Sequence, residues 1–190
     1  MTISSVKTGA VGLSLALDNN YMEPIATTLV GSGGVNQVTF NDIPQTYKHL
    51  QLRLLARTNA PYTYSSVYLN LNGDFSSSYA IHDLFGNGSS VGASGRTDTA
   101  IYTQLITGAN AISNNFGVIV ADILDYANTN KNKTVRALGG MDNNGTGTPA
   151  GEVHLRSGLW VSTLPISSIV ITSDGNFVQY SRFSLYGIKG

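Results

Sequence analysis

Three histidines, His49, His82 and His154, are the side chains best suited to metal binding or proton transfer. They are isolated from one another and form no HxH or HxxxH spacing, which is how two imidazoles on one element share a metal ion. Folding can still bring distant histidines together, but a hydrogen-bonded or exposed imidazole is the commoner role. We therefore expect structural histidines and no metal site.

Two acids, Asp122 and Asp125, lie three residues apart, and Asp83 and Asp98 stand elsewhere in the chain. Hydrolysis of a glycosidic bond needs two carboxylates on opposite sides of a sugar. Because such pairs arise by chance in most sequences, a glycan-active enzyme stays only an alternative. The other interpretation is that Asp125 braces a turn with its side-chain oxygens.

Two oxygen-rich loops, Asn72-Gly73-Asp74 and residues 142–145 (DNNG), contain the ligand types that Ca²⁺ requires. Neither has the spacing of an EF-hand, and both are good turn sequences, so we interpret them as turns. The chain has no GxSxG nucleophile elbow, Walker motif or dinucleotide fingerprint. We predict a protein without enzymatic activity and without a cofactor.

Tyrosine is abundant, with ten residues, and four of them (Tyr62, Tyr64, Tyr68 and Tyr79) lie around one loop region. Aromatic platforms serve both sugar-binding faces and protein interfaces. Half-buried sheet tyrosines are the alternative explanation. We take Tyr62 and Tyr64 as candidate surface-recognition residues.

The composition limits the partners. Eleven basic and eleven acidic residues cancel, and only 12% of residues are charged, so no net field attracts nucleic acid or an anionic membrane. Cysteine is absent, which excludes disulfides and thiolate metal sites. No apolar run approaches the ~20 residues of a membrane span. We expect a soluble protein made in the cytoplasm.

The elements that must position these residues are strands. Residues 117–124 (GVIVADIL) are apolar and β-branched, residues 133–138 alternate with a period of two, and the polar residues 125–132 separate them. This pattern predicts a long β-hairpin with a polar tip. It contains no nucleophile–base pair, no metal-ligand spacing and no phosphate loop.

About ten short strands follow from turn signals spaced along the chain. The predicted strands cover residues 25–30, 35–40, 47–58, 66–71, 79–85 (a strand or a helical turn), 99–106, 117–124, 133–138, 153–161, 167–173 and 177–188. We interpret residues 86–95 and 139–151 as loops and residues 174–176 as a turn. The fold class predicted is all-β, an antiparallel, jelly-roll-like β-sandwich.

The first 23 residues differ from the rest. Val11, Leu13, Leu15 and Leu17 alternate with small residues, which indicates an extended strand. We predict an extended N-terminal arm over residues 1–23 and a β-sandwich domain over residues 24–190. The four apolar residues are candidates for a capsid or subunit interface, because an arm can pair with a neighbour. An ordinary first strand or a disordered tail is the alternative.

The C-terminal residues 180–190 (YSRFSLYGIKG) resemble the C-terminus of a group of tailed-bacteriophage virion proteins. Five further segments resemble the same group: residues 30–34 (VGSGG), 43–50 (IPQTYKHL), 69–74 (LNLNGD), 122–131 (DILDYANTNK) and 157–160 (SGLW). These motifs are structural and span about residue 25 to the end. The resemblance implies kinship with capsid decoration (cement) proteins, head fibres or tail-associated proteins, and no reaction.

From this resemblance we expect a capsid decoration protein on the outer surface of the virion. Its expected partners are the major capsid protein and further copies of itself, as a homotrimer, with no nucleic acid and no membrane. The alternative is a tail-fibre, baseplate or receptor-binding protein whose tyrosine-rich loops touch a glycan.

Overall fold

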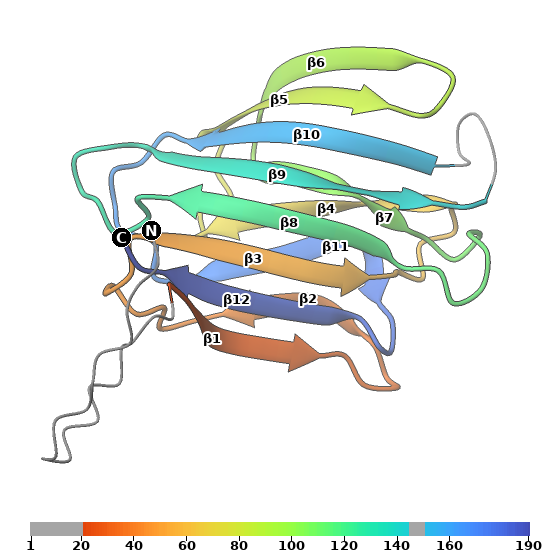
Figure 1. The fold of residues 1–190 in the computed structure, drawn as a ribbon, viewed down its shortest axis with the longest axis horizontal. Coiled ribbons are helices and arrows are strands. Elements are labelled where there is room, and N and C mark those ends of the chain that lie inside the picture. Colours follow the sequence, from red (N-terminus) through yellow and green to blue (C-terminus); the bar gives the residue numbers. More distant parts are fainter. Residues whose placement is uncertain (1–20, 145–150) are drawn as a thin grey trace, which may run out of the picture.

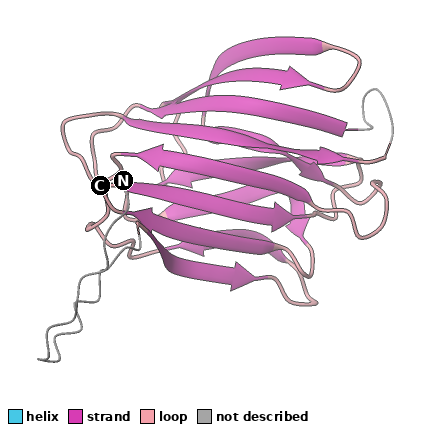
Figure 2. Cartoon of the chain, viewed as in Figure 1, coloured by secondary structure: helices cyan, strands magenta, loops and turns pink. Residues whose placement is uncertain are grey.

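The computed structural model describes residues 21–144 and 151–190, and over these ranges the chain consists of strands and loops alone (Figure 2). Twelve strands are present there. They are β1 (Met22–Leu29), β2 (Val35–Phe40), β3 (His49–Ala56), β4 (Tyr64–Leu71), β5 (Tyr79–Gly86), β6 (Val91–Asp98), β7 (Ile101–Thr107), β8 (Gly117–Leu124), β9 (Lys133–Asp142), β10 (Gly151–Trp160), β11 (Ile169–Phe177) and β12 (Arg182–Ile188).

The strands form two antiparallel sheets that pack face to face (Figure 1). The larger sheet has eight strands in the order β1-β12-β3-β8-β9-β10-β5-β6, and the smaller has four in the order β2-β11-β4-β7. The predicted all-β sandwich is therefore confirmed, while its jelly-roll character stays a prediction. The predicted hairpin is also confirmed, because β8 and β9 pair directly at the centre of the larger sheet.

Alternation of side chains sets which face of each strand is buried. In β3, Leu50, Leu52 and Leu54 are buried, while Arg53 and Leu55 point to the opposite face and are exposed. Inward side chains of both sheets build one core, as the period of two requires. Its aromatic contacts include Tyr79 stacked on Trp160 and Phe177 packed edge-on against Phe183.

Two predicted loops are wrong in part. Residues 86–95 do not form a flexible loop, because β6 begins at Val91 and pairs with β5 along its whole length. This strand lies at the edge of the sheet, and most of its positions are exposed. Its sequence therefore lacks the alternation of apolar and polar residues that predicts a strand. Residues 139–142 likewise continue β9, and only then does the chain leave the sheet.

The end of the chain also differs from the prediction. Residues 174–176 are not a turn between strands but an irregular part of β11, where its register with β2 shifts between Thr172 and Phe177. The single closing strand predicted over residues 177–188 is wrong, because the chain turns at residues 178–181 and resumes as β12. Tyr180 has a positive φ of 73° in that turn.

The predicted arm falls largely outside the described residues, including Val11, Leu13, Leu15 and Leu17. Strand β1 begins at Met22, so it starts inside the range 1–23 that we assigned to the arm. It pairs with β12 at one edge of the larger sheet. The described residues include no helix that is long and apolar enough to cross a membrane.

Candidate functional site

The outer face of the larger sheet exposes a continuous apolar surface. Seven large side chains on it, here called the apolar face, are between 45% and 84% exposed: Leu55, Leu84, Val91, Val118, Leu138, Val153 and Leu155. They come from six adjacent strands, β3, β8, β9, β10, β5 and β6. Six strands extend across about 24 Å of sheet. A patch of several hundred Å² of this kind usually marks an interaction site.

The strand register arranges these side chains in two rows across the sheet. In the first row, Leu55 lies beside Val118, then come Gly140, Val153, Gly86 and Val91. In the second row, Arg53 lies beside Val120, then come Leu138, Leu155, Leu84 and Ala93. The first row therefore alternates between valine and glycine from β8 to β6.

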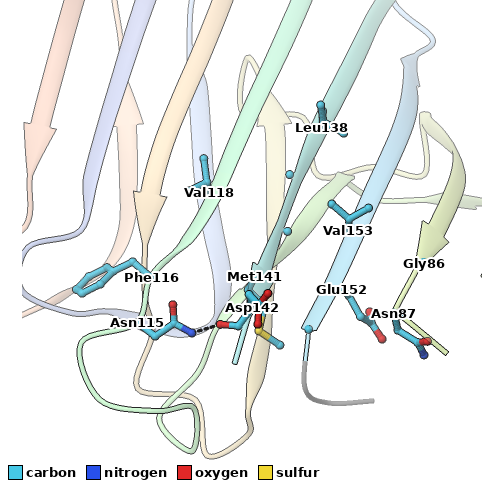
Figure 3. A pocket seen from close by; sticks show the side chains of 14 residues that line it. Gly86, Asn87, Asn115, Phe116, Val118, Leu138, Met141, Asp142, Glu152 and Val153 are labelled. Atoms are coloured by element: carbon cyan, nitrogen blue, oxygen red, sulfur yellow. Dashed lines mark hydrogen bonds between the residues drawn. The ribbon is translucent and has the colours of Figure 1, made fainter. Parts of the chain in front are cut away.

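The glycines of β9 are required by the close approach of neighbouring strands. A Cβ on Gly139 would lie 2.3 Å from the carbonyl oxygen of Val118, and one on Gly140 would lie 2.1 Å from that of Glu152. Both positions must therefore stay without a side chain. A shallow hollow of about 880 Å³ lies beside Gly140 and Gly86. It is lined by Val118, Leu138 and Val153 and also by Asn115, Asp142 and Glu152 (Figure 3).

A polar row borders the apolar face. It contains Gln51, whose side chain donates a hydrogen bond to Asp122 at 2.8 Å and accepts one from Arg53 at 2.6 Å. Arg136 lies opposite Asp122 on β9, and the exposed His82 lies further along the row on β5. The apolar face thus ends against a border that carries both signs of charge.

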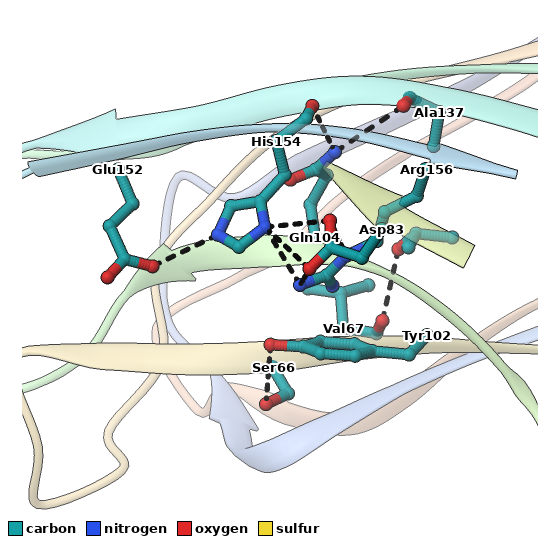
Figure 4. Close-up of polar contacts among 10 residues, drawn as sticks. Ser66, Val67, Asp83, Tyr102, Gln104, Ala137, Glu152, His154 and Arg156 are labelled. Atoms are coloured by element: carbon teal, nitrogen blue, oxygen red, sulfur yellow. Dashed lines mark hydrogen bonds and ion pairs between the residues drawn. The ribbon is translucent and has the colours of Figure 1, made fainter. Parts of the chain in front are cut away.

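A second cluster of charges is buried between the sheets (Figure 4). His154 Nδ1 lies 3.0 Å from Asp83 Oδ1, and its Nε2 lies 3.0 Å from Glu152 Oε2. Arg156 Nε lies 2.9 Å from Asp83 Oδ1, and its guanidinium carbon lies 3.5 Å from the centre of the Tyr102 ring. The side chains of His154 and Arg156 are almost fully buried.

This cluster is organised as a buried ion-pair network. Burial opposes the ionisation of Asp83, but hydrogen bonds and charge from Arg156 and His154 outweigh it, so the pKa of Asp83 lies below its ordinary value. Each carboxylate is already engaged by a neighbouring side chain, and the Phe85 ring stacks on His154. The geometry supports a role in joining β5, β10 and β7, with no acid left free to attack a substrate.

The acids considered for glycoside chemistry are occupied in the same way. Asp125, at a positive φ of 47°, pairs with Lys131 at 2.7 Å and with Lys48 at 3.2 Å. Hydrogen bonds from these two lysines, that of Lys131 first, lower the pKa of Asp125 to about 2. The interpretation that Asp125 braces the hairpin tip is confirmed.

Asn72-Gly73 forms a turn, as predicted, whereas Asp142 still belongs to β9 and residue 145 lies outside the described residues. Asn72 Oδ1 accepts hydrogen bonds from the backbone of Ser167 and Ser168, and Asp74 accepts from Trp160 Nε1 at 2.7 Å. Asp142 Oδ1 accepts from the backbone of Asn144. In the part of the chain that the structure describes, no three His, Asp or Glu side chains are placed to hold a metal ion together.

The tyrosines do not form one cluster. Tyr62 and Tyr64 are 61% and 38% exposed and line a shallow hollow of about 440 Å³ together with Asp174. Tyr68 donates a hydrogen bond to Asp174, whereas Tyr79 is buried in the core against Trp160. Tyr62 and Tyr64 therefore stay candidates for surface recognition, while Tyr79 belongs to the core.

The sequence analysis missed the apolar face, although one signal for it was present. The run Val118-Ile119-Val120 is apolar at consecutive positions, so it places apolar side chains on both faces of β8. The sequence pattern predicts this run only as one strand of the hairpin. The four-stranded sheet covers only the inner face, which leaves the other apolar set exposed.

Comparison with known proteins returned no relative. No protein-family model, no curated protein and no solved structure matches this chain.

Proposed function

We propose that this chain is a structural protein of a tailed-bacteriophage particle, namely a capsid decoration protein that binds the outer surface of the shell and stabilises it. It would act by contact with the major capsid protein and with other copies of itself. The expected location is the outer surface of the capsid, after synthesis in the host cytoplasm.

The observation that carries this proposal is the exposed apolar face of the larger sheet. Seven large apolar side chains in register across six strands are costly to leave in water, so a surface of this kind is typical of a protein that works by association. The motifs that resemble phage virion proteins form turns and strands of the same sandwich. These include the Asn72-Gly73 turn and strand β12.

The acidic side chains interact with other residues of the same chain, which supports the same proposal. Asp83, Asp125 and Asp74 each accept hydrogen bonds or pair with cations of the fold. A structural protein uses its acids in this way, whereas a hydrolase keeps two of them facing a substrate cleft. Many modest contacts per particle still give firm attachment, because multivalent binding multiplies weak affinities.

The proposal is tested by adding the purified chain to shells that lack it. We expect the full chain to co-sediment with the shells to a saturating ratio and to raise the temperature at which they rupture. A chain without residues 1–20 is expected to stay folded and to bind shells no longer, because the contacts are predicted to come from Val11, Leu13, Leu15 and Leu17. Failure of the full chain to bind any shell of its phage would reject the proposal.

A tail-fibre or receptor-binding role is the second candidate, and the exposed pair Tyr62 and Tyr64 favours it. Their hollow would offer an aromatic platform to a sugar ring. Under this alternative, Tyr62→Ala weakens attachment to host cells while shells remain unaffected. Under the decoration proposal, the same variant leaves both shell binding and host attachment unchanged.

A further inference from the structure

We propose that the apolar face is the contact surface of a two-fold dimer, in which two copies of this chain pack their larger sheets face to face. The proposed function includes contacts between copies of this chain, and the dimer specifies one of them. Its biological role therefore rests on the proposed function. The dimer itself can be measured without a capsid.

The alternation of valine and glycine makes the surface complementary to itself. A two-fold axis parallel to the strands and midway between β9 and β10 places β9 over β10 of the second copy, and β8 over β5. Val153 of the second copy then lies over Gly140, and Val118 lies over Gly86 of the second copy. Stacked sheets are about 10 Å apart, so each valine fills the space that a glycine leaves.

The same two-fold axis also places the second row of the apolar face over apolar residues of the second copy. Leu138 lies over Leu155 of the second copy, and Val120 lies over its Leu84. Arg53, at the border, lies over Ala93 of the second copy and keeps its guanidinium at the rim. No two charges of the same sign are brought together in these rows.

The two-fold axis also brings the polar borders of the two copies opposite each other. Asp122 on β8 is placed opposite His82 of the second copy on β5, and Arg136 opposite Ser157. Each of these pairs occurs twice, as a two-fold contact requires. Because the net charge of the chain is zero, long-range repulsion between copies is small.

The extent of the surface suits a second copy. Seven side chains at 45% exposure or more supply several hundred Å² on each copy, close to the ~800 Å² per partner of a standard interface. The central residues Leu138 and Leu155 would be the energetic anchors, since residues near the middle of an interface lose the most water.

Sedimentation velocity over a wide concentration series tests this dimer. We expect wild type to be a dimer and Leu138→Glu and Leu155→Glu each to weaken dimerisation by about 30-fold or more. Leu164→Glu is the matched control, because Leu164 is 61% exposed but lies in the β10–β11 loop. It should leave the dimer intact. A wild type that stays monomeric, or a trimer insensitive to Leu138→Glu, would overturn the inference.

A second experiment remains decisive if the glutamate variants fail to fold. The chain has no cysteine, so Val120→Cys and Leu84→Cys can be introduced together and treated with a short bismaleimide. Within one chain these positions are three strands apart, roughly 14 Å. Between copies they face each other. We expect covalent dimers from the double variant and few from either single variant, whereas equal yields from all three would contradict the proposed axis.

The two proposals fail in different ways. A chain that dimerises but binds no shell would reject the capsid role and leave the dimer standing. A chain that binds shells as a monomer would reject the dimer and leave the capsid role standing.

Discussion

At the scale of single residues, the charged side chains of this protein stabilise its fold. The clearest case is Arg156, which is buried between the sheets against Asp83 and over the Tyr102 ring. Burying a guanidinium group is costly, and here the carboxylate of Asp83 compensates its charge. Removing that carboxylate leaves the positive charge uncompensated inside the protein, which lowers the free energy of unfolding.

The substitution Asp83→Asn is therefore expected to destabilise the fold. The substitution should lower the free energy of unfolding by about 3 kcal/mol, because breaking a buried pair leaves an uncompensated charge. Asp98→Asn is the control, since the Arg96–Asp98 pair is largely exposed, and it should cost less than about 1 kcal/mol. Urea unfolding of the two variants measures both values. Equal, small losses would show that the buried network contributes little.

Asp125 predicts a dependence of stability on pH. Its folded pKa of about 2 lies below the unfolded value of about 3.9, so its stabilisation is present above pH 4 and is lost as the pH falls toward 2. Asp125→Asn should therefore unfold at a lower temperature than wild type near neutral pH, and the difference should vanish near pH 2. Asparagine tolerates the positive φ at this position, so the turn itself is preserved.

Thermal unfolding by circular dichroism between pH 2 and pH 7 measures this difference. Asp42→Asn is a suitable control, because Asp42 is an exposed carboxylate at a similar positive φ of 52°. A difference between Asp125→Asn and wild type that stays constant across the pH range would contradict the role of the two lysines.

At the scale of elements, β9 determines the shape of the candidate site. Its first residues alternate regularly, and its glycines Gly139 and Gly140 then allow the neighbouring strands to approach. Because Gly140 has no side chain, it leaves room in the hollow that it lines. One strand thus contributes both to the core and to the form of the exposed surface.

The variant Gly140→Ala tests this claim. Its Cβ would lie 2.1 Å from the carbonyl oxygen of Glu152, so β9 and β10 would have to separate locally. We expect a loss of about 2 kcal/mol or more in the free energy of unfolding, measured by urea denaturation. Gly33→Ala is the matched control, because no atom lies within 4 Å of its added Cβ, and it should be nearly neutral. Equal losses in the free energy of unfolding for Gly140→Ala and Gly33→Ala would contradict the close approach of Glu152 to Gly140.

The same elements show how far the sequence could predict the fold. The β8–β9 hairpin was predictable because a β-branched run and a period-two run flank a polar tip. Strand β6 was not, because an edge strand exposed on both faces needs no apolar pattern. Residues 174–176 resemble a turn locally, and they lie within β11 because the pairing with β2 resumes beyond them at Phe177.

The candidate site was harder to predict than the fold. Leu84, Leu138 and Leu155 lie on three different strands, and only the register of the sheet joins them. Likewise Asp83 and His154 are 71 positions apart in sequence, so their pairing has no local signal. Asp83 and His154 could be named from the sequence, but Leu84, Leu138 and Leu155 could not, because the surface that they form depends on long-range pairing.

At the scale of the whole molecule, the unequal sizes of the two sheets account for the exposed apolar face. Four strands pack on the inner face of eight, and the outer face of the larger sheet is left to meet something else (Figure 1). We propose that a second copy of the chain covers that face and that the assembled protein binds the outside of a phage capsid.

The most direct test of the proposed function is the number and position of copies on purified virions of the phage that we propose as the source of the chain. Quantitative mass spectrometry gives the copy number relative to the major capsid protein, and gold-labelled antibody shows the position in negative stain. The account predicts label over the head, with an even number of copies comparable to the number of capsomers. A few copies confined to the tail would contradict it.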